Sequence, residues 1–148
     1  MTDALDHNRR ATAAARAFYE RLTPADLASL REVYADDAAF RDPFNDVRGV
    51  DAIARIFTKM FAELDDVRFS IRETVVGEEG AMVVWDMTYR VRRWRPRQAQ
   101  SIHGATHLRF APDGRIAWHR DYWDAAGELY AKLPLIGPLM RYLERRLA

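Results

Sequence analysis

The chain has 148 residues, of which 49% are hydrophobic, 11% aromatic and 30% charged. This length and composition suit one globular domain, residues 1–148, with a sizeable core, and leave no room for a second. With 23 basic and 22 acidic residues the net charge is +1, so no overall field favours a nucleic-acid partner. The absence of cysteine excludes disulfides, thiolate nucleophiles and cysteine metal sites.

The beginning of the chain, MTDALDHNRRATAAARAF, lacks the apolar core of a signal peptide. No later segment approaches the roughly 18 apolar residues of a membrane span. We therefore expect a soluble, cytoplasmic protein. The basic stretch YRVRRWRPRQ at 89–98 interleaves arginines with a tryptophan, a pattern that can bind single strands. We interpret it as a solvated strand end, because a hairpin turn at 95–97 interrupts it.

Helical spacing of apolar residues dominates the first half of the chain. A first helix is predicted to end before Thr23, and Thr23, Pro24 and Asp26 predict the cap and first turn of a second. A third is predicted from about Asp51. The apolar residues of these helices are Ala11, Ala15, Phe18 and Leu22, then Leu27, Leu30, Val33 and Tyr34, then Ile53, Ile56, Phe57, Met60, Phe61 and Leu64. Between the second and third helices, AAFRD predicts a short strand and PFNDVRG a loop.

The period of the apolar pattern changes from 3.6 to 2 in the second half, which predicts a sheet. Four strands are expected at 67–76, 81–94, 98–111 and 115–124, joined by GEEG, RPRQ and PDG turns that make neighbours antiparallel. Long strands twist strongly, and the helices need one face of the sheet to cover. The expected fold class is α+β, three helices on a curved antiparallel sheet.

The end of the chain, 125–148, predicts extra helices: a short helix, a break at Pro134 to Pro138, and an amphipathic helix. We expect the last helix to pack on the domain or on a second subunit.

The segment WHRDYWD at 118–124 concentrates aromatic and charged residues. Neighbours in a strand point to opposite faces, so His119, Asp121 and Trp123 form one row. The other row contains Trp118, Arg120, Tyr122 and Asp124. Whichever row faces inward buries an acid.

Four segments in order, LREVYADDAAFRDPF, VRGVDAIARIF, GATHLRF and WHRDYWD, resemble the SnoaL-like and ketosteroid isomerase-like branch of the nuclear transport factor 2 superfamily. The resemblance covers roughly residues 11–127. It implies a cystatin-like cone, in which helices and a curled sheet enclose a pocket, and a homodimer joined through the sheet. The members include isomerases, cyclases, epoxide hydrolases, dehydratases and non-catalytic binders, so the fold does not fix the function.

The resemblance to ketosteroid isomerases places Asp42, which precedes Pro43, at the position of the general base. Those enzymes also carry a tyrosine and a protonated aspartic acid that hydrogen-bond the developing enolate, and these positions hold Phe18 and Thr106. Losing one such donor typically costs roughly 2.7 to 4 kcal/mol of transition-state stabilisation, which argues against ordinary steroid isomerisation. Tyr19 lies about 100° around the helix from Phe18, so it is not expected to substitute.

The resemblance to limonene epoxide hydrolases places Asp121 at their catalytic aspartate. Their mechanism also requires an arginine and a second aspartate, and these positions hold Met87 and Tyr89. The chain therefore lacks two of the three charged groups of that mechanism.

The family geometry predicts that Asp42, His119 and Asp121 face an aromatic-lined pocket as its catalytic groups. The predicted ligand-binding residues are Phe18, Phe44, Met60, Trp85, Met87, Tyr89, Thr106 and Trp123. Desolvation within such walls favours general-base behaviour of a carboxylate. Asp42 could instead cap the PFND loop, Asp121 could form an ion pair with Arg109 or Arg120, and His119 could be a core residue.

No metal or cofactor is expected, and His103 and His107 are predicted on the other side of the sheet. The leading hypothesis is a small cofactor-independent enzyme that binds a hydrophobic polycyclic or terpenoid-like molecule. It would use Asp42, assisted by His119 or Asp121, for proton transfer, as an isomerase or cyclase does, or for water activation, as a hydrolase does. The alternatives are a non-catalytic small-molecule-binding module and a dimerisation module of the same fold.

Overall fold

One mixed sheet with the strand order β2-β1-β6-β5-β4-β3 organises the described part of the chain. The computed structural model describes residues 2–132 and 136–147. The helical elements are α1 (Thr2–Arg21), the 3₁₀ helix η1 (Pro24–Ser29), α2 (Leu30–Val33), α3 (Val50–Glu63), α4 (Ala125–Glu128), η2 (Tyr130–Lys132) and α5 (Gly137–Leu147). The strands are β1 (Tyr34–Arg41), β2 (Asp46–Arg48), β3 (Leu64–Gly77), β4 (Gly80–Val91), β5 (Gln100–Phe110) and β6 (Ile116–Trp123).

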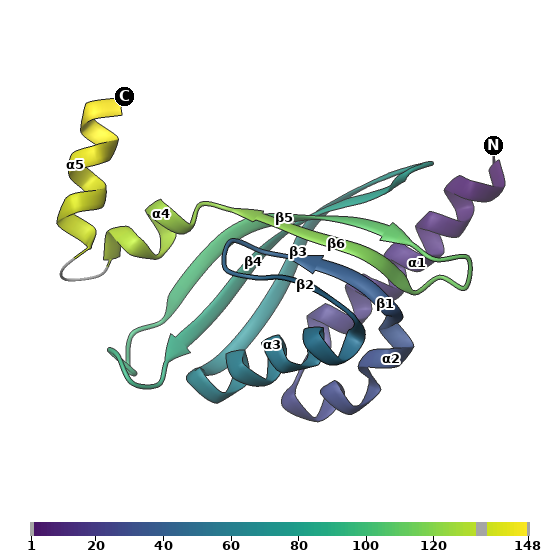
Figure 1. Cartoon of the computed structure of the whole chain (residues 1–148), viewed down its shortest axis with the longest axis horizontal. Helices are drawn as coiled ribbons and strands as arrows, with labels where there is room; N and C mark the ends of the chain where they lie inside the picture. The colour runs from purple at the N-terminus through teal and green to yellow at the C-terminus, as the bar shows by residue number, and fades with distance from the viewer. Residues whose placement is uncertain (1, 133–135, 148) are drawn as a thin grey trace.

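The helices of the first half cover one face of this sheet (Figure 1). Strands β3 to β6 pair in antiparallel fashion, as the short turns predict. The α+β cone expected from the sequence is confirmed. The sheet is not wholly antiparallel, however, because β1 pairs with β6 in parallel. Nothing in the sequence between 34 and 41 predicts this long-range pairing.

Three predicted boundaries in the first half are wrong. The second helix is a 3₁₀ turn followed by a short α-helix that ends at Val33, and Tyr34 begins β1 because pairing with Ile116 starts there. The segment predicted as a loop contains β2, which pairs with β1. Leu64 opens β3 and is not the last helical residue. The predicted cap is confirmed, since the Thr23 N–H and hydroxyl both donate to Asp26 Oδ2 at 2.8 Å.

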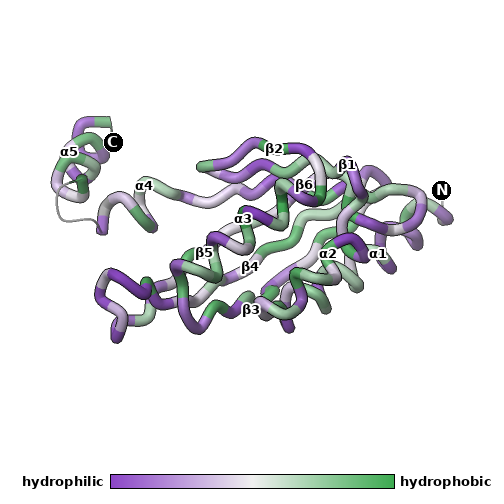
Figure 2. The backbone as a smooth tube through the Cα atoms, turned by 60° about the horizontal axis from the view of Figure 1, so that its bottom comes forward, coloured by the Kyte–Doolittle hydropathy of each residue, from purple (hydrophilic) through white to green (hydrophobic). Residues whose placement is uncertain are grey.

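The hairpin between β4 and β5 is longer than predicted. Its loop covers residues 92–99, and Arg95 has a positive φ of 47° that closes the turn. The loop is drawn mostly as hydrophilic in Figure 2, which agrees with its interpretation as a solvated strand end.

The C-terminal helix α5 lies beyond the end of the sheet, away from α1 to α3 (Figure 1). Its apolar side chains Leu139, Tyr142, Leu143 and Leu147 are exposed, so these four do not provide the expected packing on the domain. The predicted break between the last two helices falls partly on residues 133–135, which lie outside the described residues. None of the helices in the described ranges is both long and apolar enough to span a membrane.

Candidate functional site

A cavity of about 750 Å³ lies between the helices and the sheet. Its wall combines residues of α1 and α3 with residues of β3 to β6, and apolar side chains predominate. Within this wall the aromatic ring of Tyr19 contacts the rings of Phe57 and Phe69. A concave apolar space with a few polar groups is the usual form of a small-molecule site.

Four polar side chains, three of which line the cavity, form one hydrogen-bonded chain. The Tyr19 and Tyr34 hydroxyls share a short hydrogen bond. The Tyr34 hydroxyl lies 2.8 Å from His119 Nδ1, and His119 Nε2 lies 2.8 Å from Asp121 Oδ1. Tyr34 is fully buried and His119 is 3% exposed, so the middle of the chain is shielded from solvent. Its two ends, Tyr19 and Asp121, both line the cavity.

Asp121 also accepts a second hydrogen bond at the same oxygen. The Thr106 hydroxyl donates to Asp121 Oδ1 at 2.6 Å, and Trp85 Nε1 donates to Thr106 Oγ1 at 2.8 Å. Within the described part of the chain, Asp121 Oδ2 accepts no hydrogen bond. One carboxylate oxygen is therefore held in place, while the other can meet a ligand.

The parallel pairing of β1 with β6 brings Tyr34 and His119 together. A register shift between Tyr34 and Ala39 interrupts the strand alternation, which leaves Asp36 and Asp37 exposed while Tyr34 is buried. The side chain of Phe40, which is paired with His119 in the register, stacks on the imidazole ring at 4.4 Å. The imidazole is thus fixed in orientation by a ring on one side and by hydrogen bonds at both nitrogens.

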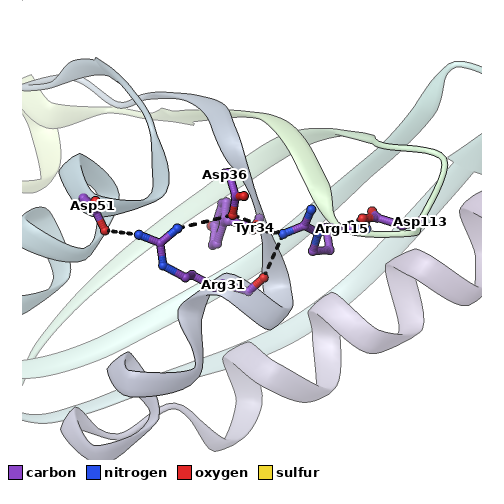
Figure 3. A network of polar contacts seen from close by, with 6 residues as sticks. All are labelled: Arg31, Tyr34, Asp36, Asp51, Asp113 and Arg115. Carbon is purple, nitrogen blue, oxygen red and sulfur yellow. Dashed lines mark hydrogen bonds and ion pairs between the residues drawn. The ribbon is translucent and has the colours of Figure 1, made fainter.

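A surface network of ion pairs fixes the start of β1 (Figure 3). Arg31 bridges Asp36 and Asp51 at 3.3 and 2.7 Å. Arg115 also reaches Asp36, at 3.4 Å, and donates to the Tyr34 carbonyl at 3.5 Å. These contacts join α2, α3 and the turn before β6 around the backbone of Tyr34.

Tyr19 and Tyr34, the two tyrosines of the hydrogen-bonded chain, are held in their neutral form. Burial raises the pKa of Tyr19, and the negative charge of Asp121 adds to the increase. Burial is also the main cause of the raised pKa of Tyr34, followed by its interaction with Tyr19. Both hydroxyls therefore keep their protons and remain hydrogen-bond donors at neutral pH.

Asp42 lies at the mouth of the cavity, and its carboxylate caps the PFND turn. Its Oδ1 accepts hydrogen bonds from the backbone N–H groups of Phe44 and Asn45, both at 2.7 Å. The Asn45 side chain donates to both carboxylate oxygens at 3.0 Å. This is the capping arrangement that the sequence left open as the alternative to a catalytic role.

The structure brings together all the predicted site residues except Phe18. The residues that line the cavity are Asp42, Phe44, Met60, Trp85, Met87, Tyr89, Thr106, His119, Asp121 and Trp123. Phe18 is 2% exposed and packs in the core, so its expected place in the wall is wrong. The next residue, Tyr19, lines the cavity, because α1 turns that side of the helix toward the sheet.

The other histidines of the sheet lie outside the cavity, as predicted. His103 Nδ1 lies 2.6 Å from Asp86, and the His107 ring packs edge-on against Trp118. The hydrogen bond with His103, and then the one with Arg72, lowers the pKa of Asp86. Residues 2–132 and 136–147 contain no cluster of three or more His, Asp or Glu side chains that could hold a metal ion.

The sequence interpretation missed Tyr19 and Tyr34 as members of the site. The apolar spacing predicts Tyr34 in a helix, and the family resemblance places Phe18, not Tyr19, at the position of the isomerase tyrosine. Two tyrosines near helix ends, together with an inward His119, could have suggested a polar cluster. These residues come together only through the pairing of β1 with β6, which local patterns do not predict.

The model of the SnoaL-like domain matches residues 15–119, so the chain belongs to the SnoaL-like family. No curated protein matches it. Among solved structures, a hypothetical protein with a ketosteroid isomerase-like fold from Catenulispora acidiphila, in complex with trimethylamine, is similar. It has 17% identity and a TM-score of 0.66, with 80% of this chain and 88% of that chain covered.

Two further solved structures are similar. One is a nuclear transport factor 2-like protein of unknown function from Burkholderia pseudomallei. It has 16% identity and a TM-score of 0.68, and the match covers 82% of this chain and 93% of that chain. An epoxide hydrolase from Mycobacterium tuberculosis, of the limonene epoxide hydrolase-like type, has 17% identity and a TM-score of 0.63, covering 86% of each chain. At these identities the likeness shows the fold alone.

Proposed function

We propose that the protein is a cofactor-independent acid–base enzyme that acts on a hydrophobic, polycyclic or terpenoid-like molecule bound in the cavity. The observation that carries this proposal is Asp121, whose side chain is only 17% exposed and whose Oδ2 is left open in an apolar wall. A base needs a free oxygen within reach of the ligand, and Oδ2 provides one inside the cavity because both hydrogen bonds to Asp121 are made at Oδ1. The reaction class is proton transfer at a carbon next to a carbonyl, or activation of a water.

Asp121 is the proposed base, and His119 and Thr106 are its positioning residues. Two hydrogen bonds at Oδ1 hold the carboxylate in one orientation. A base must lie within hydrogen-bond reach of the proton it takes, so a fixed orientation contributes directly to the rate. Asp42 remains the rival base that the sequence predicts, but its carboxylate oxygens are already engaged by the turn.

The test is turnover of a panel of enones, β-keto compounds and epoxides by the wild type, Asp121→Asn and Asp42→Asn. We expect conversion of at least one class by the wild type and loss of that conversion in Asp121→Asn. Equal rates in the wild type and Asp121→Asn would reject Asp121 as the base.

The alternative function is binding without turnover, which the absence of the isomerase oxyanion donors at Phe18 and Thr106 favours. It predicts that hydrophobic ligands raise the unfolding temperature while no member of the panel is converted. Detection of a product that depends on the cavity residues would reject it.

We also propose a homodimer through the outer face of the sheet. This face carries apolar side chains that a monomer leaves partly exposed, including Val75 at 57% and Tyr122 at 47%. The expected mass in light scattering is that of two chains, and a monomer at micromolar concentration would contradict the proposal.

A further inference from the structure

The direction of the hydrogen-bonded chain from Tyr19 to Asp121 determines what the cavity can recognise. As a carboxylate, Asp121 can only accept hydrogen bonds. With a neutral imidazole, the proton shared with Asp121 is therefore on His119 Nε2, at 2.8 Å from Oδ1. His119 Nδ1 then carries a lone pair and must accept.

The remaining donors follow from this assignment. The Tyr34 hydroxyl donates to His119 Nδ1 at 2.8 Å, which uses its one proton. The Tyr34 oxygen can then only accept from Tyr19 in their shared hydrogen bond. Each donor along the chain points toward Asp121, so the proton of the Tyr19 hydroxyl points away from the cavity.

Tyr19 is consequently an acceptor toward any ligand. Its side chain lines the cavity, whereas Tyr34 behind it is fully buried. The oxygen of Tyr19 has a lone pair left over, while its proton is already committed to Tyr34. A ligand carbonyl at this position would meet no donor, but a ligand hydroxyl would find an acceptor.

We propose that Tyr19 is a recognition site for a hydroxyl group of the ligand, and that the substrate class is an apolar ring compound carrying an alcoholic, enolic or phenolic O–H. The site rests on the proposed function, because it places the hydroxyl at one end of the chain and the base Asp121 at the other. The pKa values of Tyr19 and Tyr34, raised by burial, agree with neutral hydroxyls along the chain.

The binding test compares 2-naphthol, which can donate a hydrogen bond, with 2-methoxynaphthalene, which can only accept one. We expect the wild type to prefer 2-naphthol by about tenfold, the typical worth of one hydrogen bond. In Tyr19→Phe the preference should fall to about onefold, because the acceptor oxygen is gone. Any preference that remains in this variant measures the effect of the extra methyl group. In Tyr34→Phe the Tyr19 proton is released toward the cavity, so the preference should fall below that of the wild type.

Tyr122→Phe is the matched control, because Tyr122 lies on the opposite face of the sheet beside Arg120. It should keep the preference of the wild type. Equal preference in the wild type and Tyr19→Phe would overturn the proposal, and so would an unchanged preference in Tyr34→Phe. A role of the tyrosines in packing alone would weaken both probes equally.

A second readout does not depend on any ligand. Nitrogen-15 NMR of the imidazole distinguishes which ring nitrogen of His119 carries hydrogen. The proposal predicts hydrogen on Nε2 alone, and hydrogen on Nδ1 would overturn it. If these results hold while the substrate panel is not converted, the proposed catalysis fails and the hydroxyl site stands.

Discussion

The Tyr34 hydroxyl lies 2.8 Å from His119 Nδ1, although the two residues are 85 positions apart in the chain. This contact joins the first strand in the chain, β1, to the last strand, β6. It turns two inward-facing side chains into the centre of a polar chain within an apolar cavity. The neutral state of the two tyrosine hydroxyls and the packing around the cavity can each be tested.

Raising the pH tests the neutral state of the two tyrosines. Because their folded pKa values lie above the ordinary value of 10.0, the fold favours the protonated forms. Their contribution to stability is complete below pH 10 and is lost as the pH rises through the folded pKa values. We expect the free energy of unfolding to fall above about pH 10.

The corresponding measurement is tyrosinate absorbance during an alkaline titration, followed together with circular dichroism. Tyr34→Phe should remove absorbance only from the step that coincides with unfolding. If Tyr34→Phe instead removes absorbance from a reversible step before unfolding, Tyr34 ionises in the folded protein, and its hydroxyl is not held neutral.

Gly104→Ala tests the packing of the Trp85 indole, which donates a hydrogen bond to Thr106. A Cβ at this position would lie 2.7 Å from the Trp85 ring and 3.0 Å from the Trp123 Cβ. The indole would have to move, and its hydrogen bond to Thr106 would be strained. We expect a loss of about 1–3 kcal/mol in the free energy of unfolding, measured with urea.

Gly77→Ala is the control for this substitution, since a Cβ there meets nothing within 4 Å. It should leave the free energy of unfolding unchanged to within about 0.5 kcal/mol. If both variants lose the same free energy of unfolding, the contact with Trp85 is not the cause of the loss in Gly104→Ala.

The mouth of the cavity predicts a preference among ligands by charge. Arg55 and Lys59 lie one turn apart on α3, line the cavity and are exposed. Two cations at the rim attract an anionic ligand, and salt screens this attraction. We expect 2-naphthoate to bind more weakly to Arg55→Gln/Lys59→Gln than to the wild type, whereas 2-naphthol should change little. If added salt does not weaken the binding of 2-naphthoate to the wild type, the charges of Arg55 and Lys59 are not the cause of its binding.

Removing α5 should leave the domain intact. Leu139 is 56% exposed and Leu147 is 85% exposed, so this helix adds little to the core. A chain that ends at Lys132 is expected to keep its free energy of unfolding to within about 0.5 kcal/mol. A larger loss would show that α5 packs on the domain in solution.

The helices, the strands and much of the cavity wall could be predicted from the sequence, partly from local patterns and partly from the family resemblance. The alternation in WHRDYWD groups His119 and Asp121 in one row, and the resemblance assigns this row, with Trp85 and Met87, to the cavity. The four antiparallel strands follow from the turns between them. The row and the strands need only neighbours in the chain, whereas the inner face needs the family geometry.

The hydrogen-bonded chain could not be predicted, because it depends on long-range pairing. Tyr34 carries the helical spacing of its neighbours, and only the parallel pairing with β6 and the register shift after it move Tyr34 into the sheet. The role of Tyr19 depends in turn on Tyr34. The capping by Asp42 is an alternative that the sequence predicts, since an aspartate before Pro43 and Phe44 can accept the N–H groups of its own turn.

Deuterium exchange at the carbon beside the carbonyl of 2-tetralone shows whether Asp121 is the base of the cavity. We expect exchange by the wild type, a loss of at least about 100-fold in Asp121→Asn, and a much smaller loss in Asp42→Asn. All three proteins should show the same circular dichroism spectrum. Exchange that survives in Asp121→Asn but disappears in Asp42→Asn would assign the base to Asp42 and reject Asp121.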